Sequence, residues 1–405
     1  MFGKLAVIAL ILITPAALAA PDPVRVATLA AEAEEEGRDP VEFVIAALDE
    51  RDLIVFDEGL HNAVEPWEFY ARLVADARFS DRAQFVFLEV VPFNQQKHID
   101  AYLAASKNDP LLLWPAFQNA LATGWNYQIY YDFLSAVWTA NRSLPAEKRI
   151  KVIGVSPPTY WSEITSSEDY ARYRRDGFAG YDHDMYARIV MHLADFDGSA
   201  KGIFLTNTRH AYTGLKKSDG GYFWNATTYF TQWRPGRAYS IRFNAPFLEV
   251  KKTGEEKGPT LGPMSAGVVY GWTRADGGAW DAAFAKNGDR PVAISLKNTE
   301  FGAAPYVGNT MLSAAPGQTM ADVNDAVIHL KPLEDWRQTA TNGEMYTPAF
   351  RKELKRRLPF IYPGDELAKA MEREGADSVE AFIEALAAAA PEAPLGPAQE
   401  LPSLD

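Results

Sequence analysis

Short, mainly apolar runs recur along the chain and predict strands that are buried on both faces. Five such runs, each bounded by polar residues or glycine, lie at residues 53–56, 85–88, 150–155, 202–206 and 291–296. Weaker runs predict two further strands at 238–243 and 325–330. Continuous apolar runs of this length are typical of parallel sheets, because both faces of such sheets are covered.

Helical patterns fill the spaces between these runs, at residues 24–36, 40–48, 65–77, 95–104, 127–141 and 181–194. Strands that alternate with helices of this length indicate βαβ units. The segment 251–278 is glycine-rich and weakly patterned, and we expect an insertion or loop there. From residue 347 the chain turns helical again, and we expect its basic run at 351–357 on a solvated helix face. We therefore predict an α/β fold: a mostly parallel central sheet flanked by helices, with a helical C-terminal extension.

The N-terminus has the pattern of a secretory signal peptide. Lys4 precedes an apolar run at 5–13, and small residues follow it at 16–20, which favours cleavage after Ala19. The run is too short to span a bilayer, which needs roughly 20 apolar residues. We expect a bacterial protein that is periplasmic or secreted, with no membrane span after cleavage. The expected organisation is a signal peptide (1–19), an α/β domain (20–345), a C-terminal helical extension (346–390) and a disordered tail (391–405).

Composition narrows the chemistry. The 405 residues are 47% hydrophobic and 23% charged, which is ordinary for a globular protein. The chain has no cysteine, which excludes disulfides, thiolate metal sites, cysteine nucleophiles and a lipid-attachment cysteine. The net charge of -13 argues against nucleic acid or an anionic membrane as the main partner, because both require clustered positive charge. We expect a small-molecule ligand or substrate.

Polar side chains follow the predicted strands where each strand ends. In an open parallel sheet, ligands bind outside the carboxyl ends of the strands. Glu58 and His61 follow the first strand, Glu89 follows the second, and His210 follows the strand at 202–206. Two imidazoles and two carboxylates at one edge could provide a general base near neutral pH, or could bind a divalent metal ion through N and O ligands. These four residues are the candidate catalytic site and the candidate metal site.

Structural roles are the alternative for each residue taken alone. Asp57 and Glu58 could accept backbone N–H groups at the start of the next helix, which Asn62 could also cap. A single histidine such as His210 is more often structural than functional. It is the joint position of the four residues that favours a site.

The remaining histidines give no second candidate. His183 and His192 are expected on the surface or in packing, and His98 and His329 have no acidic partner at metal-ligand spacing in the sequence. Familiar signatures are also absent: there is no G-x-S-x-G elbow, P-loop, dinucleotide glycine fingerprint or H-E-x-x-H. Two prolines follow Ser156, which disfavours a serine nucleophile on a strand-turn-helix.

At these positions the chain resembles the superfamily of erythromycin esterase-like, ChaN-like and Tiki-like proteins. Residues 55–62 (VFDEGLHN) are similar to the strand and G-E-x-x-H motif of that superfamily. Residues 87–91 (FLEVV) with 95–103 are most similar to ChaN-like members. Later blocks match in order, so that the resemblance covers about residues 50–335; they lie at 151–155, 206–211 and 325–330.

The resemblance implies a helix-flanked parallel sheet whose site combines Glu58 and His61 of the first motif, Glu89 of the second and His210 of the third. Two positions depart from the pattern. Asp57 stands where the superfamily usually has glycine, and Ser156 stands where esterase-like members tend to have an acidic residue. ChaN-like members are associated with haem at a lipoprotein surface.

The sequence is compatible with three functions. The first is a hydrolase in which His61 activates water, Glu58 orients the imidazole, and Glu89 with His210 completes the base network or holds a metal ion. The second is a haem- or small-ligand-binding protein without catalytic activity, in which aromatic residues at 125–131 and 222–224 line the pocket. The third is a catalytically inactive interaction domain.

Overall fold

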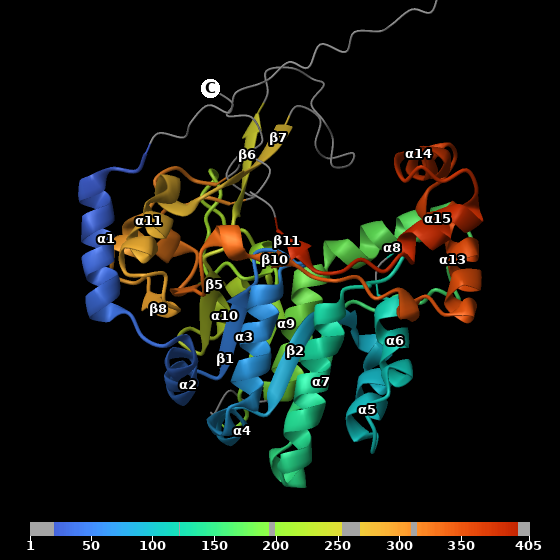
Figure 1. Ribbon diagram of the computed structural model, residues 1–405, viewed down its shortest axis with the longest axis horizontal. Coiled ribbons are helices and arrows are strands. Elements are labelled where there is room, and N and C mark those ends of the chain that lie inside the picture. The colour runs from blue at the N-terminus through green and yellow to red at the C-terminus, as the bar shows by residue number, and fades with distance from the viewer. Residues whose placement is uncertain (1–19, 121, 194–198, 253–267, 309–313, 396–405) are drawn as a thin grey trace, which may run out of the picture.

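The protein is built around a seven-stranded sheet with the order β3-β2-β4-β1-β5-β9-β8 (Figure 1). The computed structural model describes residues 20–120, 122–193, 199–252, 268–308 and 314–395. The strands of the sheet pair in parallel, except that β8 runs antiparallel to β9 at one edge. They are β1 (Leu53–Asp57), β2 (Phe85–Pro92), β3 (Lys151–Ser156), β4 (Gly202–Thr206), β5 (Ala238–Phe243), β8 (Val292–Ser295) and β9 (Ala326–His329).

Helices cover both faces of the sheet, as the apolar runs require. In β1, Ile54 and Phe56 pack on one face, against core residues from α3 and α7, while Leu53 and Val55 pack on the other, against α9 and α10. Successive side chains of a strand point to opposite faces, so a strand with both faces covered is mainly apolar, and a buried charge in it needs a partner, as Asp57 has in Arg242. The predicted α/β fold class is confirmed.

The main helices before the C-terminal extension are α1 (Pro23–Glu36), α2 (Pro40–Glu50), α3 (Val64–Ala75), α4 (Ala77–Arg82), α5 (Gln96–Ala104), α6 (Pro110–Gln118), α7 (Gln128–Ser143), α8 (Ser167–Ala179), α9 (Tyr181–Leu193), α10 (Ala226–Trp233), α11 (Ala279–Lys286) and α12 (Glu300–Ala303). None of those in the described part of the chain is both long and apolar enough to cross a membrane.

The prediction of a loop at residues 251–278 is wrong at both ends of that segment. β6 (Phe247–Lys252) and β7 (Val268–Thr273) form an antiparallel pair, and a short 3-10 turn follows at Ala275–Gly278. The sequence of β7 begins Val-Val-Tyr, residue types that are favoured in strands. The glycines around it weaken the strand pattern, which is why the sequence predicts a loop there. Residues 253–267 lie outside the described residues.

The C-terminal extension consists of α13 (Pro348–Ile361), α14 (Glu366–Arg373) and α15 (Val379–Leu386). Leu354 of α13 and Phe382 of α15 belong to the same core cluster as the residues of α3 and α7. The tail expected to be disordered is described as far as residue 395, and there β11 (Ala393–Pro394) pairs with β10 (Arg337–Gln338). The expected signal peptide at 1–19 and residues 396–405 lie outside the described residues.

The basic run on α13 is only partly the solvated face that we expected. Arg357 is 2% exposed and donates hydrogen bonds to the carbonyl oxygen of Gln118 and to Oδ1 of Asn119. Its guanidinium also lies 4.2 Å from the centroid of the Trp161 ring. Burial lowers the pKa of Arg357 to about 10, which still leaves it charged at neutral pH. Sequence pattern missed this role because the partners are far away in the chain.

Replacing Arg357 with methionine should lower the free energy of unfolding by about 2–3 kcal/mol, because buried acceptors on Gln118 and Asn119 lose a charged donor. Urea denaturation measures this loss. The exposed Lys352 on the same helix is the control, and Lys352→Met should change the free energy of unfolding little. Equal effects of the two changes would show that Arg357 has no bracing role.

Candidate functional site

The carboxyl ends of β1, β2 and β4 meet at one edge of the sheet and bring the predicted residues together. Glu58 continues the pairing of β1, since its N–H donates to the carbonyl oxygen of Thr206 on β4. The chain then turns sharply at Gly59, whose φ is +75°. A Cβ at Gly59 would lie 2.6 Å from the Cβ of Ala245, so glycine is required there. This turn returns His61 to the sheet edge.

His61 and Glu58 form a hydrogen-bonded pair. Nδ1 of His61 donates to Oε1 of Glu58 at 2.5 Å, and the other carboxylate oxygen accepts from Nε1 of Trp67 at 2.7 Å. The Glu58 side chain is 2% exposed, whereas that of His61 is 31% exposed. The pair therefore holds Glu58 in the interior and fixes the ring orientation of His61 toward the open side.

The pKa values of this pair both shift upward. Burial raises the pKa of Glu58 above its ordinary value, although the donors on His61 and Trp67 oppose the shift. Burial alone would lower the pKa of His61, but the Glu58 carboxylate raises it, and the net shift is upward. An imidazole in this environment titrates above its usual range and becomes a stronger base.

The second histidine lies between two carboxylates. Nε2 of His210 is 3.2 Å from Oε1 of Glu89, and Nδ1 of His210 is 2.6 Å from Oδ1 of Asp182. Burial lowers the pKa of His210, but the charges of Glu89 and Asp182 outweigh it and raise the pKa to about 9. His210 is therefore a cation at neutral pH.

The Glu89 carboxylate binds His210 and two further donors, on Thr206 and Asn207. The register between β2 and β3 shifts between Leu88 and Pro92, which interrupts regular pairing at Glu89. Its Oε2 accepts from the hydroxyl of Thr206 at 2.6 Å and from the backbone N–H of Asn207 at 2.9 Å. Burial opposes ionisation, yet the positive charge of His210 and these donors hold the pKa of Glu89 well below its ordinary value.

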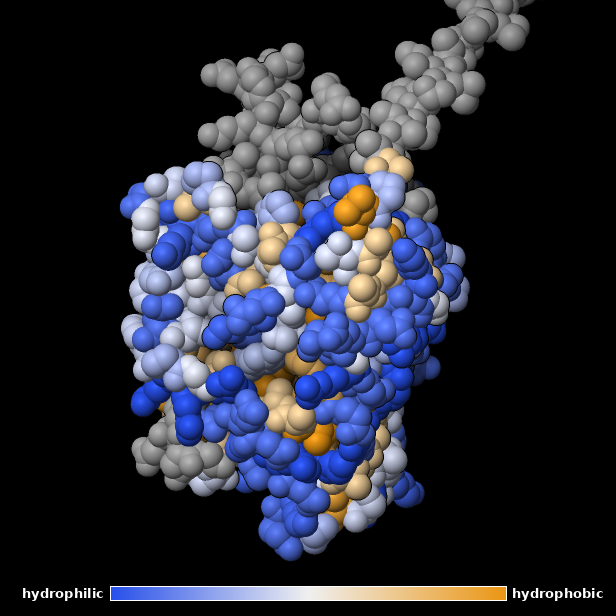
Figure 2. Space-filling model, turned by 90° about the vertical axis from the view of Figure 1, so that its left-hand side faces the viewer, coloured by the Kyte–Doolittle hydropathy of each residue, from blue (hydrophilic) through white to orange (hydrophobic). Residues whose placement is uncertain are grey.

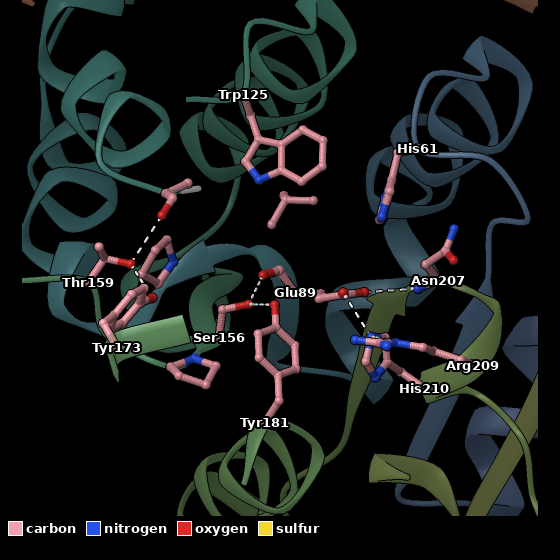
Figure 3. Close-up of a pocket in the computed structure, with 14 residues that line it drawn as sticks. His61, Glu89, Trp125, Ser156, Thr159, Tyr173, Tyr181, Asn207, Arg209 and His210 are labelled. Carbon is pink, nitrogen blue, oxygen red and sulfur yellow. Dashed lines mark hydrogen bonds and ion pairs between the residues drawn. The ribbon is translucent and has the colours of Figure 1, made fainter. Parts of the chain in front are cut away.

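A cavity of about 240 Å³ opens in front of these groups (Figure 3). His61 and Trp125 point into it from one side, and Glu89, His210 and Arg209 lie across from them. The rings of His61 and Trp125 are 5.1 Å apart, so the indole forms the apolar wall beside the imidazole. The cavity therefore presents one apolar wall and one strongly polar wall.

Three of the four predicted site residues line the cavity: His61, Glu89 and His210. Glu58 does not line the cavity. It contacts His61 from the interior side and affects the cavity by orienting that ring. Asp57, considered as a possible cap, is instead fully buried and forms an ion pair with Arg242. Asn62 is not a cap either, because the helix α3 begins after Ala63 without a side-chain cap.

Sequence reasoning missed Asp182, which holds the second nitrogen of His210. Asp182 lies in the first turn of α9, where an acidic residue is common and carries no functional signal. Only the fold brings it to the strand edge. The aromatic residues expected at 222–224 do not line the cavity: Trp224 is 46% exposed and stacks on Tyr229.

Ser156 lines the cavity but is not placed as a nucleophile. Its hydroxyl donates to the backbone carbonyl of Glu89 and lies 2.7 Å from the hydroxyl of Tyr181. No helix begins directly after β3, as the two prolines predicted. The oxygen is thus committed to holding β2, β3 and α9 together.

The four predicted residues do not fit a metal ion. In the described part of the chain, no group of three or more His, Asp or Glu side chains is placed to hold one. The donor atoms of the site are already engaged with one another or with Trp67, Thr206, Asn207 and Asp182. Only Nε2 of His61 has no partner among the described residues.

No family model matches the chain, and no curated protein matches its sequence. Solved structures are similar at low identity. A Bacillus cereus protein is 12% identical, with a TM-score of 0.48 and coverage of 76% of this chain and 97% of that one. The erythromycin esterase EreC, a mutant in its open conformation, is 11% identical, with a TM-score of 0.48 and coverage of 72% and 93%.

ChaN of Campylobacter jejuni, solved with cofacially bound heme, is 14% identical, with a TM-score of 0.31 and coverage of 57% of this chain and 91% of that one. Erythromycin esterase and ChaN, which the sequence motifs resemble, are thus both among the similar solved structures. At these TM-scores, no residue role is carried from those proteins to this chain.

The raised pKa of His210 predicts a loss of stability at high pH. The ordinary imidazole pKa is 6.5 and the folded value is about 9, so folding favours the protonated ring. This stabilisation is complete below pH 6.5 and is lost between pH 6.5 and 9, by about 3 kcal/mol.

Urea denaturation of the native protein and of His210→Gln, repeated at several pH values from 6.5 to 9, measures how steeply the free energy of unfolding depends on pH in each. The free energy of unfolding should fall more steeply with pH in the native protein. Equal slopes would show that His210 is neutral in the folded state.

Proposed function

We propose that this chain is an exported hydrolase of the erythromycin esterase, ChaN and Tiki-like type, in which His61 activates a water molecule. The observation that carries the proposal is the His61–Glu58 pair at the cavity wall. With Nδ1 bonded to Glu58, the base nitrogen Nε2 is the atom that can accept a proton from a water in the cavity. Glu58 then stabilises the imidazolium that forms.

The two histidines have different roles in this proposal. Nδ1 of His210 faces Asp182, and its Nε2 lies 3.2 Å from Oε1 of Glu89 and 3.2 Å from Nε of Arg209, so neither ring nitrogen is free to act as a base. Its charge keeps Glu89 ionised and in place. Because Asp182 and Glu89 hold this ring from both sides, His61 remains as the base of the site.

Positive charge beside the cavity supports attack on a carbonyl carbon. The guanidinium of Arg209 lines the cavity near His210. A cation placed where negative charge develops lowers the barrier to the tetrahedral oxyanion of ester hydrolysis. Water adds to the carbonyl carbon, its proton passes to His61, and the same proton is delivered to the leaving oxygen when the carbon–oxygen bond breaks.

The cavity volume favours a hydrolase over a haem-binding protein. At about 240 Å³ it lies below the ~300–1,000 Å³ typical of pockets that enclose a drug-sized ligand. It fits a small acyl group better than a whole porphyrin. The exposed position of Trp224 also removes one of the aromatic walls on which the haem hypothesis depended.

Replacing His61 with alanine should lower kcat/KM for p-nitrophenyl esters of short acids by about 10²–10⁴-fold, because the general base is lost. The melting temperature should fall moderately, because Glu58 loses one of its two donors but keeps Trp67, so both proteins are assayed well below their melting temperatures. His98→Ala, on the outer helix α5, is the matched control and should keep full activity. Wild-type turnover no faster than that of His61→Ala would contradict the proposal.

Glu58→Gln should move the rising limb of the pH–rate profile to lower pH. The Glu58 carboxylate raises the pKa of His61, and an amide removes that charge, so the imidazole deprotonates at lower pH. In the native protein the limb should lie above pH 6.5. The profile of kcat/KM measures both positions, with the exposed Glu68→Gln as control. An unchanged limb would show that Glu58 does not control the base.

A further inference from the structure

A second cavity, of about 370 Å³, lies at the carboxyl end of β9. It is the same edge of the sheet, where α/β folds bind ligands, but it shares no lining residue with the first cavity. Its walls come from α11, from Ala20 and Pro21 before α1, and from the segments around residues 277 and 332. The side of the molecule on which α11 lies is mostly hydrophilic, with small separate hydrophobic areas (Figure 2). A small ligand therefore suits this site better than a large apolar partner.

His329 lines this cavity and is buried without a hydrogen bond. The ring is 1% exposed and stacks on Phe284, with centroids 4.3 Å apart and planes at 13°. Neither ring nitrogen has a hydrogen-bond partner among the described residues. A buried polar group left in this state costs about 1–3 kcal/mol. Burial also lowers the pKa of His329 to about 4, so the ring is neutral at physiological pH.

A carboxylate lies beside His329 on Asp289, although β8 and α12 separate the two residues in the sequence. Oδ1 of Asp289 lies 3.7 Å from Nε2 of His329. No acidic residue stands at metal-ligand spacing from His329 in the sequence, so only the fold brings Asp289 beside it. Asp289 has a φ of +51°, a conformation that non-glycine residues rarely adopt and that the surrounding structure must hold in place.

The lining has an excess of negative charge. Its side chains include the carboxylates of Asp281, Asp289 and Glu334 but one cationic group, the guanidinium of Arg274; cleavage after Ala19 would add the α-amino group of Ala20. Arg274 forms ion pairs with Glu334 at 2.5 Å and with Asp281 at 3.4 Å. Asp289 has no cationic side chain paired with it among the described residues. The cavity thus offers one uncompensated carboxylate beside one neutral imidazole.

We infer that this cavity binds a small aliphatic amine, whose ammonium group lies between the Asp289 carboxylate and the His329 ring. An ammonium group has three N–H donors and no acceptor. One donor meets the carboxylate of Asp289, and another meets the lone pair of Nε2 after a small shift of the imidazole or of the Asp289 turn, because Nε2 is buried when the cavity is empty. The hydrocarbon part packs on Ala282, Ala285 and Pro332, which form the apolar wall.

A divalent metal ion fits this site less well. His329 and Asp289 would be its two protein ligands, because Arg274 already holds the other two carboxylates. In the described ranges no third His, Asp or Glu is positioned to complete a metal site. The volume of the cavity and its apolar wall also exceed what an ion alone requires.

Isothermal titration calorimetry with n-butylamine and 1,4-diaminobutane tests the inference. We expect one amine per protein molecule, with no binding of the uncharged 1-butanol. Binding should weaken at least about tenfold in His329→Phe and in Asp289→Asn. The melting temperature of His329→Phe should be equal or higher, because phenylalanine keeps the stacking on Phe284 and removes two unpaired nitrogens.

His192→Phe is the matched control, since this histidine also packs against phenylalanines but lies away from the cavity. It should leave amine binding unchanged. Absence of binding at millimolar amine would overturn the inference. So would amine binding that survives in His329→Phe, or a Zn²⁺ site that is lost in both variants while the amines do not bind.

Discussion

Two carboxylates, Glu58 and Glu89, lie almost entirely out of water at the carboxyl edge of the sheet, with exposed fractions of 2% and 8%. A buried carboxylate is stable only when donors or positive charge compensate its lost hydration. Each is compensated by a different histidine, and the rest of the site follows from that requirement. Trp67 and His61 donate hydrogen bonds to Glu58. Asn207 donates a hydrogen bond to Glu89, and His210 forms an ion pair with it.

The two histidines differ because their second nitrogens meet different surroundings. His210 has a second carboxylate, Asp182, on its other side, which makes the cationic form the stable one. His61 has one carboxylate and an open cavity, which leaves a nitrogen for chemistry. Of the two histidines at this edge, His210 is therefore a fixed cation and His61 is a base. This division is the physical basis of the proposed hydrolysis.

The sheet and the core of this site could be predicted from sequence because both depend on local patterns. The run at residues 53–56, which forms most of β1, is apolar at every position, and the polar residues after it lie at the edge of the sheet. Glu58, His61, Glu89 and His210 were found by this rule. Asp57 follows the same rule in sequence yet is paired with Arg242, since its register in the sheet sets it opposite that residue on β5.

The remaining groups depend on contacts between distant segments, for which the sequence has no local signal. Asp182 reaches His210 from the start of a helix, Arg357 reaches Gln118 across more than two hundred residues, and Asp289 reaches His329 from a turn. Each looks like an ordinary surface charge in the sequence. Only packing of the helices on the sheet determines which of them turn inward.

Nitrogen-15 NMR of the histidine rings, at the pH of maximal activity, tests the division between the two imidazoles most directly. Both ring nitrogens of His210 should carry protons. His61 should carry one proton, on Nδ1, with an unprotonated Nε2. A neutral His210, or a His61 ring protonated on Nε2, would mean that the two imidazoles are not divided into a fixed cation and a base.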